Sequence, residues 1–172
     1  MNLLILGGNS QRNKEWVHKV DSSVKDLFDK TIVHEYQHWT TGAEMVDFDA
    51  ELDLIAAEVQ NLGKYAIFAK SVGSILSMTL IGRGRLNPSF CVFAGVALKL
   101  ARESGIEVVE LLETLKCPTV IIQNDNDPVG RFEEVRSLVD TGEGIKLVET
   151  SGDDHSYDDL ELIRSELEEN LT

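Results

Sequence analysis

The sequence predicts a single α/β domain with a six-stranded, mostly parallel sheet and helices on both faces. Short apolar runs alternate with longer amphipathic stretches along the whole chain. Most of these runs are continuously apolar, as parallel strands buried on both faces should be. Strands that alternate with helices build a parallel sheet between two helical layers. A three-layer sandwich is therefore expected.

The first third of the chain is expected to hold two strands and two helices. Residues 3–6 are a wholly apolar strand. Residues 9–30 carry a helix with apolar side chains three and four positions apart. Residues 31–38 form a second, more polar strand, which places it nearer an edge of the sheet. Residues 49–62 form an amphipathic helix.

In the middle of the chain, residues 65–69 are a third strand, and a helix over 72–80 follows it almost without a loop. Residues 90–94 form a fourth strand. An irregular stretch separates this strand from a helix over 108–115. The strand-to-helix junction near residue 71 is therefore unusually abrupt.

The last third begins with a fifth strand over residues 119–123. A helix over 128–139 follows, with a proline near its first turn, where proline is tolerated. Residues 146–149 form a sixth strand, and an acidic helix over 157–171 closes the domain. A chain of 172 residues without linker or repeat is expected to form one domain, residues 1–172.

Composition limits the partners of the protein. The net charge of −14 disfavours binding to nucleic acid or to anionic membrane surfaces. The apolar N-terminal run lacks a basic region, is too short for a signal peptide, and no later run has membrane-spanning length. Cys91 and Cys117 lie in or beside apolar runs, and two buried thiols without a secretion signal favour a reducing compartment. We expect a cytoplasmic protein.

Chemistry is expected in the loops that follow strands, because open α/β sheets bind ligands beyond the carboxyl ends of their strands. Four such loops contain glycine, serine or other polar residues, namely 7–10, 70–73, 124–128 and 151–155. In the second loop, Ser71 lies on a turn so sharp that the residues two before and two after it must be small. These are Ala69 and Gly73. The alternative is that Ser71 only caps the following helix.

The segment Ala69-Lys70-Ser71-Val72-Gly73 resembles the nucleophile elbow G-x-S-x-G of the α/β-hydrolases, with alanine in place of the first glycine. The resemblance implies that Ser71 is a nucleophile and that the strand order is 2-1-3-4-5-6. It also implies a truncated fold of the compact, lidless, esterase-like kind. The chain starts at the strand that carries the oxyanion loop, and the segment between the fourth and fifth strands is too short for a large lid.

The same resemblance implies the other two members of a Ser-Asp-His triad. The fifth strand leads to Asp127, although Asp125 is a plausible substitute. The sixth strand leads through a small polar turn to His155. The alternatives are that Asp127 only forms a turn before proline and that His155 is a solvated loop histidine. In such a triad an imidazole accepts the serine proton and a carboxylate orients it, so no cofactor or metal is needed.

An oxyanion hole is expected beside Ser71. The backbone amide of Val72 is one donor, and the glycine-containing loop after the first strand supplies the other. Asn9 is the preferred donor, with Gly8 or Ser10 as close alternatives that also contact substrate. A nucleotide-binding role for this loop is weakly supported, since G-x-G-x-x-G is absent.

Two further residues are assigned to substrate binding. Lys70 is expected to be exposed beside the serine. It either attracts an anionic substrate or simply suits the outward-facing position of the elbow without binding substrate. Trp39, with His38, is expected at the pocket mouth. His34 and His38 are four apart but lack a helix and a third ligand, so no metal site is expected.

The function expected from these residues is cleavage of a carboxylic ester or related acyl bond in a small molecule, through a Ser71 acyl-enzyme. The alternative from another class is a non-catalytic interaction module on the same fold. A flavodoxin-like nucleotide binder is a weaker third possibility.

Overall fold

The computed structural model describes residues 1–139 and 144–171. Its central feature is a six-stranded, wholly parallel sheet in the order β2-β1-β3-β4-β5-β6, which confirms the predicted strand order. The strands are β1 (Asn2–Leu6), β2 (Lys30–His34), β3 (Tyr65–Ser71), β4 (Cys91–Val96), β5 (Thr119–Asn124) and β6 (Ile145–Thr150).

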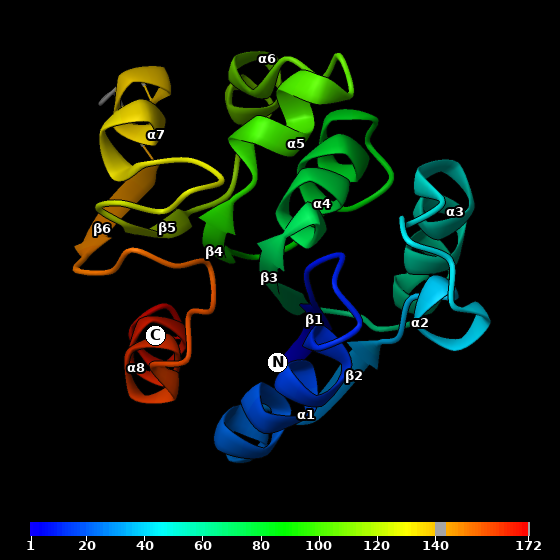
Figure 1. Ribbon diagram of the computed structural model, residues 1–172. Helices are drawn as coiled ribbons and strands as arrows, with labels where there is room; N and C mark the ends of the chain where they lie inside the picture. The colour runs from blue at the N-terminus through cyan, green and yellow to red at the C-terminus, as the bar shows by residue number, and fades with distance from the viewer. Residues whose placement is uncertain (140–143, 172) are drawn as a thin grey trace.

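Helices cover both faces of the sheet (Figure 1). The first and last helices pack against each other on one face, and the helices between β2 and β6 lie on the other. They are α1 (Asn13–Val24), with a 3₁₀ turn at Lys25–Leu27, α2 (His38–Thr41), α3 (Phe48–Val59), α4 (Val72–Gly82), α5 (Leu98–Glu103), α6 (Val108–Glu113), α7 (Phe132–Leu138) and α8 (Leu160–Glu169). The predicted three-layer architecture is confirmed.

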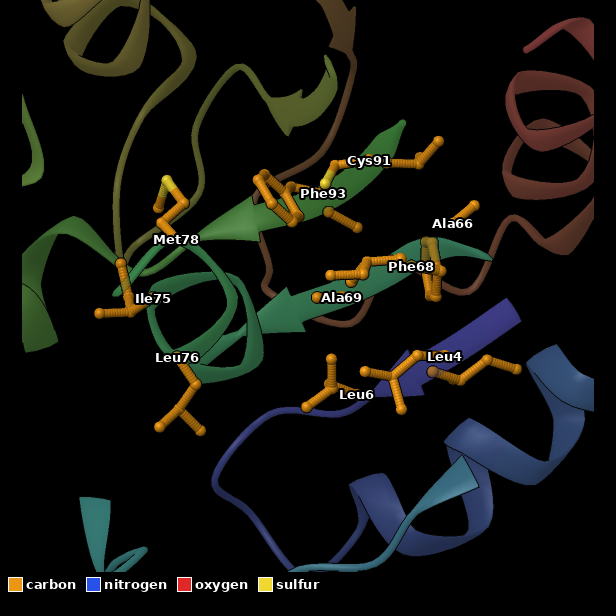
Figure 2. Close-up of a cluster of buried hydrophobic side chains, with 14 of the residues drawn as sticks. Leu4, Leu6, Ala66, Phe68, Ala69, Ile75, Leu76, Met78, Cys91 and Phe93 are labelled. Carbon is orange, nitrogen blue, oxygen red and sulfur yellow. The ribbon is translucent and has the colours of Figure 1, made fainter. Parts of the chain in front are cut away.

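The core lies where β1, β3 and β4 meet α4 (Figure 2). Every residue of β3 and β4 is buried, which explains why these segments are continuously apolar apart from Lys70 and Ser71. Phe68 and Phe93 fill the interior from neighbouring strands. Because α4 is apolar on all sides and packs against the sheet and other helices, it holds the strand-to-helix junction rigidly.

Several element boundaries differ from the prediction. The helix expected over 9–30 starts only at Asn13, because the preceding residues form a loop at the sheet edge. The strand expected over 31–38 ends at His34, and α2 follows. There the Gln37 backbone N–H donates to Glu51 Oε1 (2.8 Å) rather than to a neighbouring strand. The stretch expected to be irregular contains α5.

Two later helices begin after their expected first residues. Helix α7 starts at Phe132 because the residues before it form a tight turn on the Asp127 side chain, whose Oδ1 accepts from the Val129 backbone N–H (2.7 Å). Helix α8 starts at Leu160, where the Asp159 side chain caps it. Of the two thiols expected to be buried, Cys91 is buried and Cys117 is partly exposed, with their sulfurs 3.8 Å apart. Over the described residues, no helix combines the length and apolarity needed to cross a membrane.

Candidate active site

Strand β3 passes into α4 without an intervening residue, and Ser71 is the junction. Its backbone has φ 55° and ψ −121°, and the pairing with β4 shifts register between Lys70 and Ser71. A residue with a side chain rarely adopts this conformation, so the surrounding structure must hold it there. The sharp turn predicted at Ser71 is therefore present.

The residues next to the turn show why it needs small side chains. A Cβ on Gly73 would lie 2.7 Å from the Gly7 carbonyl oxygen and 2.9 Å from the Leu6 Cβ, so only glycine fits. Ala69 is completely buried. The Ser71 side chain makes no capping hydrogen bond to α4. The alternative that Ser71 only caps the helix is therefore wrong.

Asp127 lies in the loop after β5 and is 1% exposed. Its Oδ2 lies 2.7 Å from His155 Nδ1 and accepts a hydrogen bond of 2.6 Å from the Tyr157 hydroxyl. Burial opposes ionisation of this carboxyl, but the hydrogen bonds from His155 and Tyr157 outweigh it and lower the pKa of Asp127. Asp127 thus forms the predicted turn with one oxygen and contacts the imidazole with the other.

Asp125 does not contact the imidazole. Its Oδ1 accepts from the backbone N–H groups of Asn126 and Gly152, each at 2.9 Å. Because Gly152 belongs to the loop after β6, Asp125 ties together the two loops that carry Asp127 and His155. Its position does not favour the substitution for Asp127 considered from the sequence.

His155 presents one ring nitrogen to Asp127 and keeps the other unpaired. Nε2 is buried and has no hydrogen-bond partner within the described residues. Buried nitrogens without a partner are rare, and this is the atom that would take a proton from a serine. A side chain with an anchored Nδ1 and a buried, unpaired Nε2 is unlike a solvated loop histidine.

The position of the imidazole follows from its contacts with the end of β4. A Cβ on Gly95 would lie 2.8 Å from His155 Cε1 and 2.4 Å from Tyr157 Cε2. The next residue, Val96, pairs in register with Ser71. Since neighbouring strands are about 4.8 Å apart, the His155 ring lies over the strand adjacent to the elbow.

The loop after β1 touches the serine from the other side. A Cβ on Gly8 would lie 3.2 Å from the Ser71 Cβ. The Gly7 carbonyl accepts from the Tyr36 hydroxyl at 3.0 Å. The Asn9 carbonyl accepts from Trp39 Nε1 at 3.1 Å and lies 2.6 Å from His38 Nε2.

These anchored carbonyls orient the amides of the loop. In a trans peptide the N–H points away from the carbonyl, so the Gly8 and Ser10 N–H groups are turned away from the anchoring rings, with the Asn9 N–H between them. Of the three predicted loop donors, Gly8 is the one that lies directly against Ser71. The Val72 N–H lies at the start of α4, where the first amides lack helical partners.

The expectation that Lys70 is exposed is wrong. Its side chain is 5% exposed, and Nζ donates to the Ser156 carbonyl (2.7 Å) and to Asn13 Oδ1 (3.2 Å). Nζ also lies 4.5 Å from the centre of the Trp16 ring. The physical reason is that both faces of β3 are covered, so a side chain opposite the core points into the α1 layer. Burial lowers the pKa of Lys70 to about 8, despite the nearby carboxylates of Asp158, Asp127 and Asp154.

Trp39 is buried and does not lie at a pocket mouth. It is 3% exposed, and its ring would contact a Cβ on Gly7 at 3.0 Å. Its position beneath the loop after β1 makes it a support for that loop. Ser10, in contrast, is exposed and lines a polar cleft of about 790 Å³ that also contains His155. Within residues 1–139 and 144–171, no group of three or more acidic, histidine or cysteine side chains is arranged to hold a metal ion.

Sequence reasoning missed three residues that shape the site. Tyr157 donates to Asp127, and its own oxygen accepts from the Asn124 backbone N–H (3.0 Å). Its place two residues after His155 was the available signal. Tyr36 and Gly95 gave no local signal, because each acts through a contact with a distant loop.

Comparison with solved structures identifies the fold as that of the α/β hydrolases. Est1E from Butyrivibrio proteoclasticus, solved with ferulic acid bound, has a TM-score of 0.77 and 15% identity over 99% of this chain and 87% of its own. Mouse alpha/beta hydrolase domain-containing protein 10 has a TM-score of 0.76 and 12% identity, covering 99% and 89%. Pyrococcus furiosus esterase Pf2001 has a TM-score of 0.74 and 14% identity, covering 99% and 80%. No protein-family model and no curated protein sequence matches the chain.

Proposed function

We propose that this protein is a serine hydrolase that cleaves a carboxylic ester or related acyl bond of a small molecule. The observation that carries the proposal is the His155 ring, which is anchored on buried Asp127, keeps its Nε2 buried and unpaired, and lies at the end of β4, the strand that pairs with the strained Ser71. Strain at one residue and an unsatisfied nitrogen at another are costly, and both are accounted for if the two groups act together on a substrate. The esterases among the similar structures support the same class of reaction.

In the proposed mechanism, the Ser71 Oγ attacks the acyl carbon while His155 Nε2 takes the hydroxyl proton. Asp127 stabilises the imidazolium that forms, and its low pKa keeps it ionised for that role. The amides of Val72 and of the Gly8–Ser10 loop stabilise the oxyanion. The imidazolium then protonates the leaving alcohol, and a water activated by the same imidazole releases the acid.

A fluorophosphonate probe tests the proposal, because it reacts covalently with activated serines. We expect labelling of the parent protein and none of Ser71→Ala. His155→Ala and Asp127→Asn should label at least about 100-fold more slowly, since loss of a triad member typically reduces rates by several orders of magnitude.

Equal labelling of the parent and Ser71→Ala would show reaction elsewhere and would overturn the proposal. Absence of labelling in the parent, with the circular dichroism of a folded protein, would favour the non-catalytic interaction module. Asp125→Asn is the matched control for Asp127→Asn, because it removes a carboxylate from the same loop but keeps the Oδ1 that accepts from the backbone N–H groups of Asn126 and Gly152.

A further inference from the structure

Two cavities of different chemistry adjoin the elbow. The first, of about 230 Å³, is lined mainly by apolar side chains, including Met45, Val46, Val72, Ile75, Leu100 and Ala101. The second is the polar cleft of about 790 Å³, which is lined by His155, Lys70, Asn13 and several charged side chains. The apolar cavity lies among α4, α5 and the segment before α3, whereas the polar cleft lies against α1 on the other face of the sheet.

The apolar cavity adjoins the elbow, because two of its lining residues lie on the first turn of α4. One of its walls, Val72, directly follows Ser71, and Ile75 lies one turn further along α4. A substrate acyl carbon bonded to Ser71 Oγ would therefore lie near the entrance of this cavity.

The Asn9 side chain links the predicted oxyanion loop to a second wall of the cavity, which is formed by residues 45 and 46. Its Oδ1 accepts from the Val46 backbone N–H (2.8 Å), and its Nδ2 donates to the Glu44 carbonyl (2.9 Å) and lies 3.4 Å from the Met45 sulfur. Met45 is 51% exposed, so this part of the cavity wall borders solvent. Asn9 thus couples the loop beside Ser71 to the wall of the apolar cavity.

The direction of the proposed reaction assigns one cavity to each half of an ester. His155 must protonate the oxygen of the leaving alcohol, so the alcohol must lie on the imidazole side, in the polar cleft. The carbonyl oxygen faces the amides of Val72 and the loop after β1. The remaining substituent of the acyl carbon, its chain, is then directed to the other side of the elbow.

We propose that the apolar cavity binds the acyl chain, and that the substrates are esters of short- to medium-chain carboxylic acids with polar alcohols. This inference rests on the proposed serine hydrolase function. The Ser71 Oγ forms a bond to the acyl carbon, the bond to the alcohol oxygen breaks, and the proton passes through His155 to the alcohol. Water then attacks the acyl carbon, the bond to Ser71 Oγ breaks, the water proton passes through His155 to that oxygen, and the acid is released. A cavity of 230 Å³ has the volume of seven or eight waters at roughly 30 Å³ each, which suits about four to eight carbons.

The test is the rate of hydrolysis for a series of acetyl, butyryl, hexanoyl and dodecanoyl esters of one chromogenic alcohol. Burial of each methylene should raise kcat/KM by about fourfold until the cavity is full. Hexanoyl carries four more methylenes than acetyl, so we expect hexanoyl to exceed acetyl by about 250-fold, and dodecanoyl to fall below hexanoyl.

Two variants locate the effect in this cavity. Ser104→Phe fills the cavity from its exposed rim, and Met45→Ser removes an apolar wall. Each should lower the hexanoyl-to-acetyl ratio of kcat/KM by about tenfold or more, since two or more methylenes would lose their contacts. Leu54→Phe is the matched control, because Leu54 is also partly exposed (38%) but lies on α3 away from the cavity. It should leave the ratio unchanged.

The two proposals fail in different ways. If the parent is labelled by fluorophosphonate at Ser71 and hydrolyses these esters, but shows no dependence on chain length, the acyl-chain inference is overturned and the hydrolase function stands. The same holds if Ser104→Phe and Met45→Ser leave the ratio unchanged. If the folded parent is neither labelled nor active, the proposed function is overturned and the inference falls with it.

Discussion

Lys70 directly precedes Ser71, the proposed nucleophile, and its ammonium group links three segments of the candidate site. It binds the Ser156 carbonyl, one residue beyond His155, and Asn13 at the start of α1. Because β3 also carries Ser71, the bond from Lys70 to Ser156 holds the loop that carries His155 against the strand that carries Ser71. A buried charge is expensive unless it is well satisfied, so its retention here indicates a positioning role.

The low pKa of Lys70 predicts a specific dependence of stability on pH. The folded pKa is about 8, against 10.5 for an ordinary lysine. Below pH 8 both states hold the proton, so the full cost of the buried charge is present. Between pH 8 and 10.5 the folded state releases the proton first, so the unfolded state binds more protons and stability rises with pH.

We therefore expect the free energy of unfolding of the parent to increase, relative to Lys70→Met, by up to about 3 kcal/mol between pH 8 and 10.5. Urea unfolding across this range measures it. Lys19→Met is the control, since it makes the same substitution at an exposed position of α1. Parallel curves for the parent and Lys70→Met would contradict the prediction.

At the scale of elements, the site depends on how the ends of neighbouring strands fit together. Asn124 at the end of β5 accepts from the Thr150 hydroxyl (2.6 Å) and donates to the Asp154 carbonyl (3.0 Å). These bonds fasten the last loop to the adjacent strand. The end of β4 then supports the ring of His155 through Gly95, which has φ 62°.

Gly95→Ala should displace the imidazole, because a Cβ there would overlap the Tyr157 ring and crowd His155. We expect kcat to fall about 100-fold, the usual result of moving a catalytic group by about 1 Å. Hydrolysis of a short ester and the rate of fluorophosphonate labelling measure the effect.

Gly84→Ala is the matched control for this prediction. Gly84 has a similar φ of 68°, but a Cβ there would meet nothing within 4 Å. Both variants should lose stability from backbone strain, by about 1 kcal/mol, while only Gly95→Ala loses activity. Equal activities of the two variants would show that the contact with His155 is unimportant.

The elements differ in how well the sequence predicts them. The buried strands were predictable because continuous apolar runs of that length suit few other structures. Helix α5 was missed, since its six residues are too few to show a helical period. The direction of Lys70 was also missed, because its partners Asn13 and Ser156 lie 57 and 86 positions away. The contact between Asp127 and His155 follows from strand order, whereas the Tyr36–Gly7 bond depends on loop geometry that local patterns do not encode.

For the whole molecule, the net charge of −14 is the dominant electrostatic property. Like charges on a compact surface repel one another, and unfolding relieves part of that repulsion. Salt screens this effect, because the Debye length falls from about 30 Å at 0.01 M to about 8 Å at 0.15 M.

We therefore expect the Tm to rise by about 2–4 °C between these salt concentrations, which corresponds to about 1 kcal/mol for a domain of this size. Scanning calorimetry in sodium chloride measures the shift. Choline chloride should give the same shift if screening is the cause. A Tm that stays constant or falls with salt would contradict the prediction.

The candidate active-site residues come from two separate parts of the chain, so a cut between these parts would place them on different fragments. The proposed nucleophile and oxyanion loop come from residues 7–72, and the proposed acid and base from residues 127–155. The turn after α4, at Gly84, lies between the two groups. A cut there would separate Ser71 from Asp127 and His155, so under the proposed mechanism neither piece alone would hydrolyse an ester. Hydrolysis would return only when β4 of the second piece re-pairs with β3 of the first, which makes catalysis a direct reporter of their reassembly.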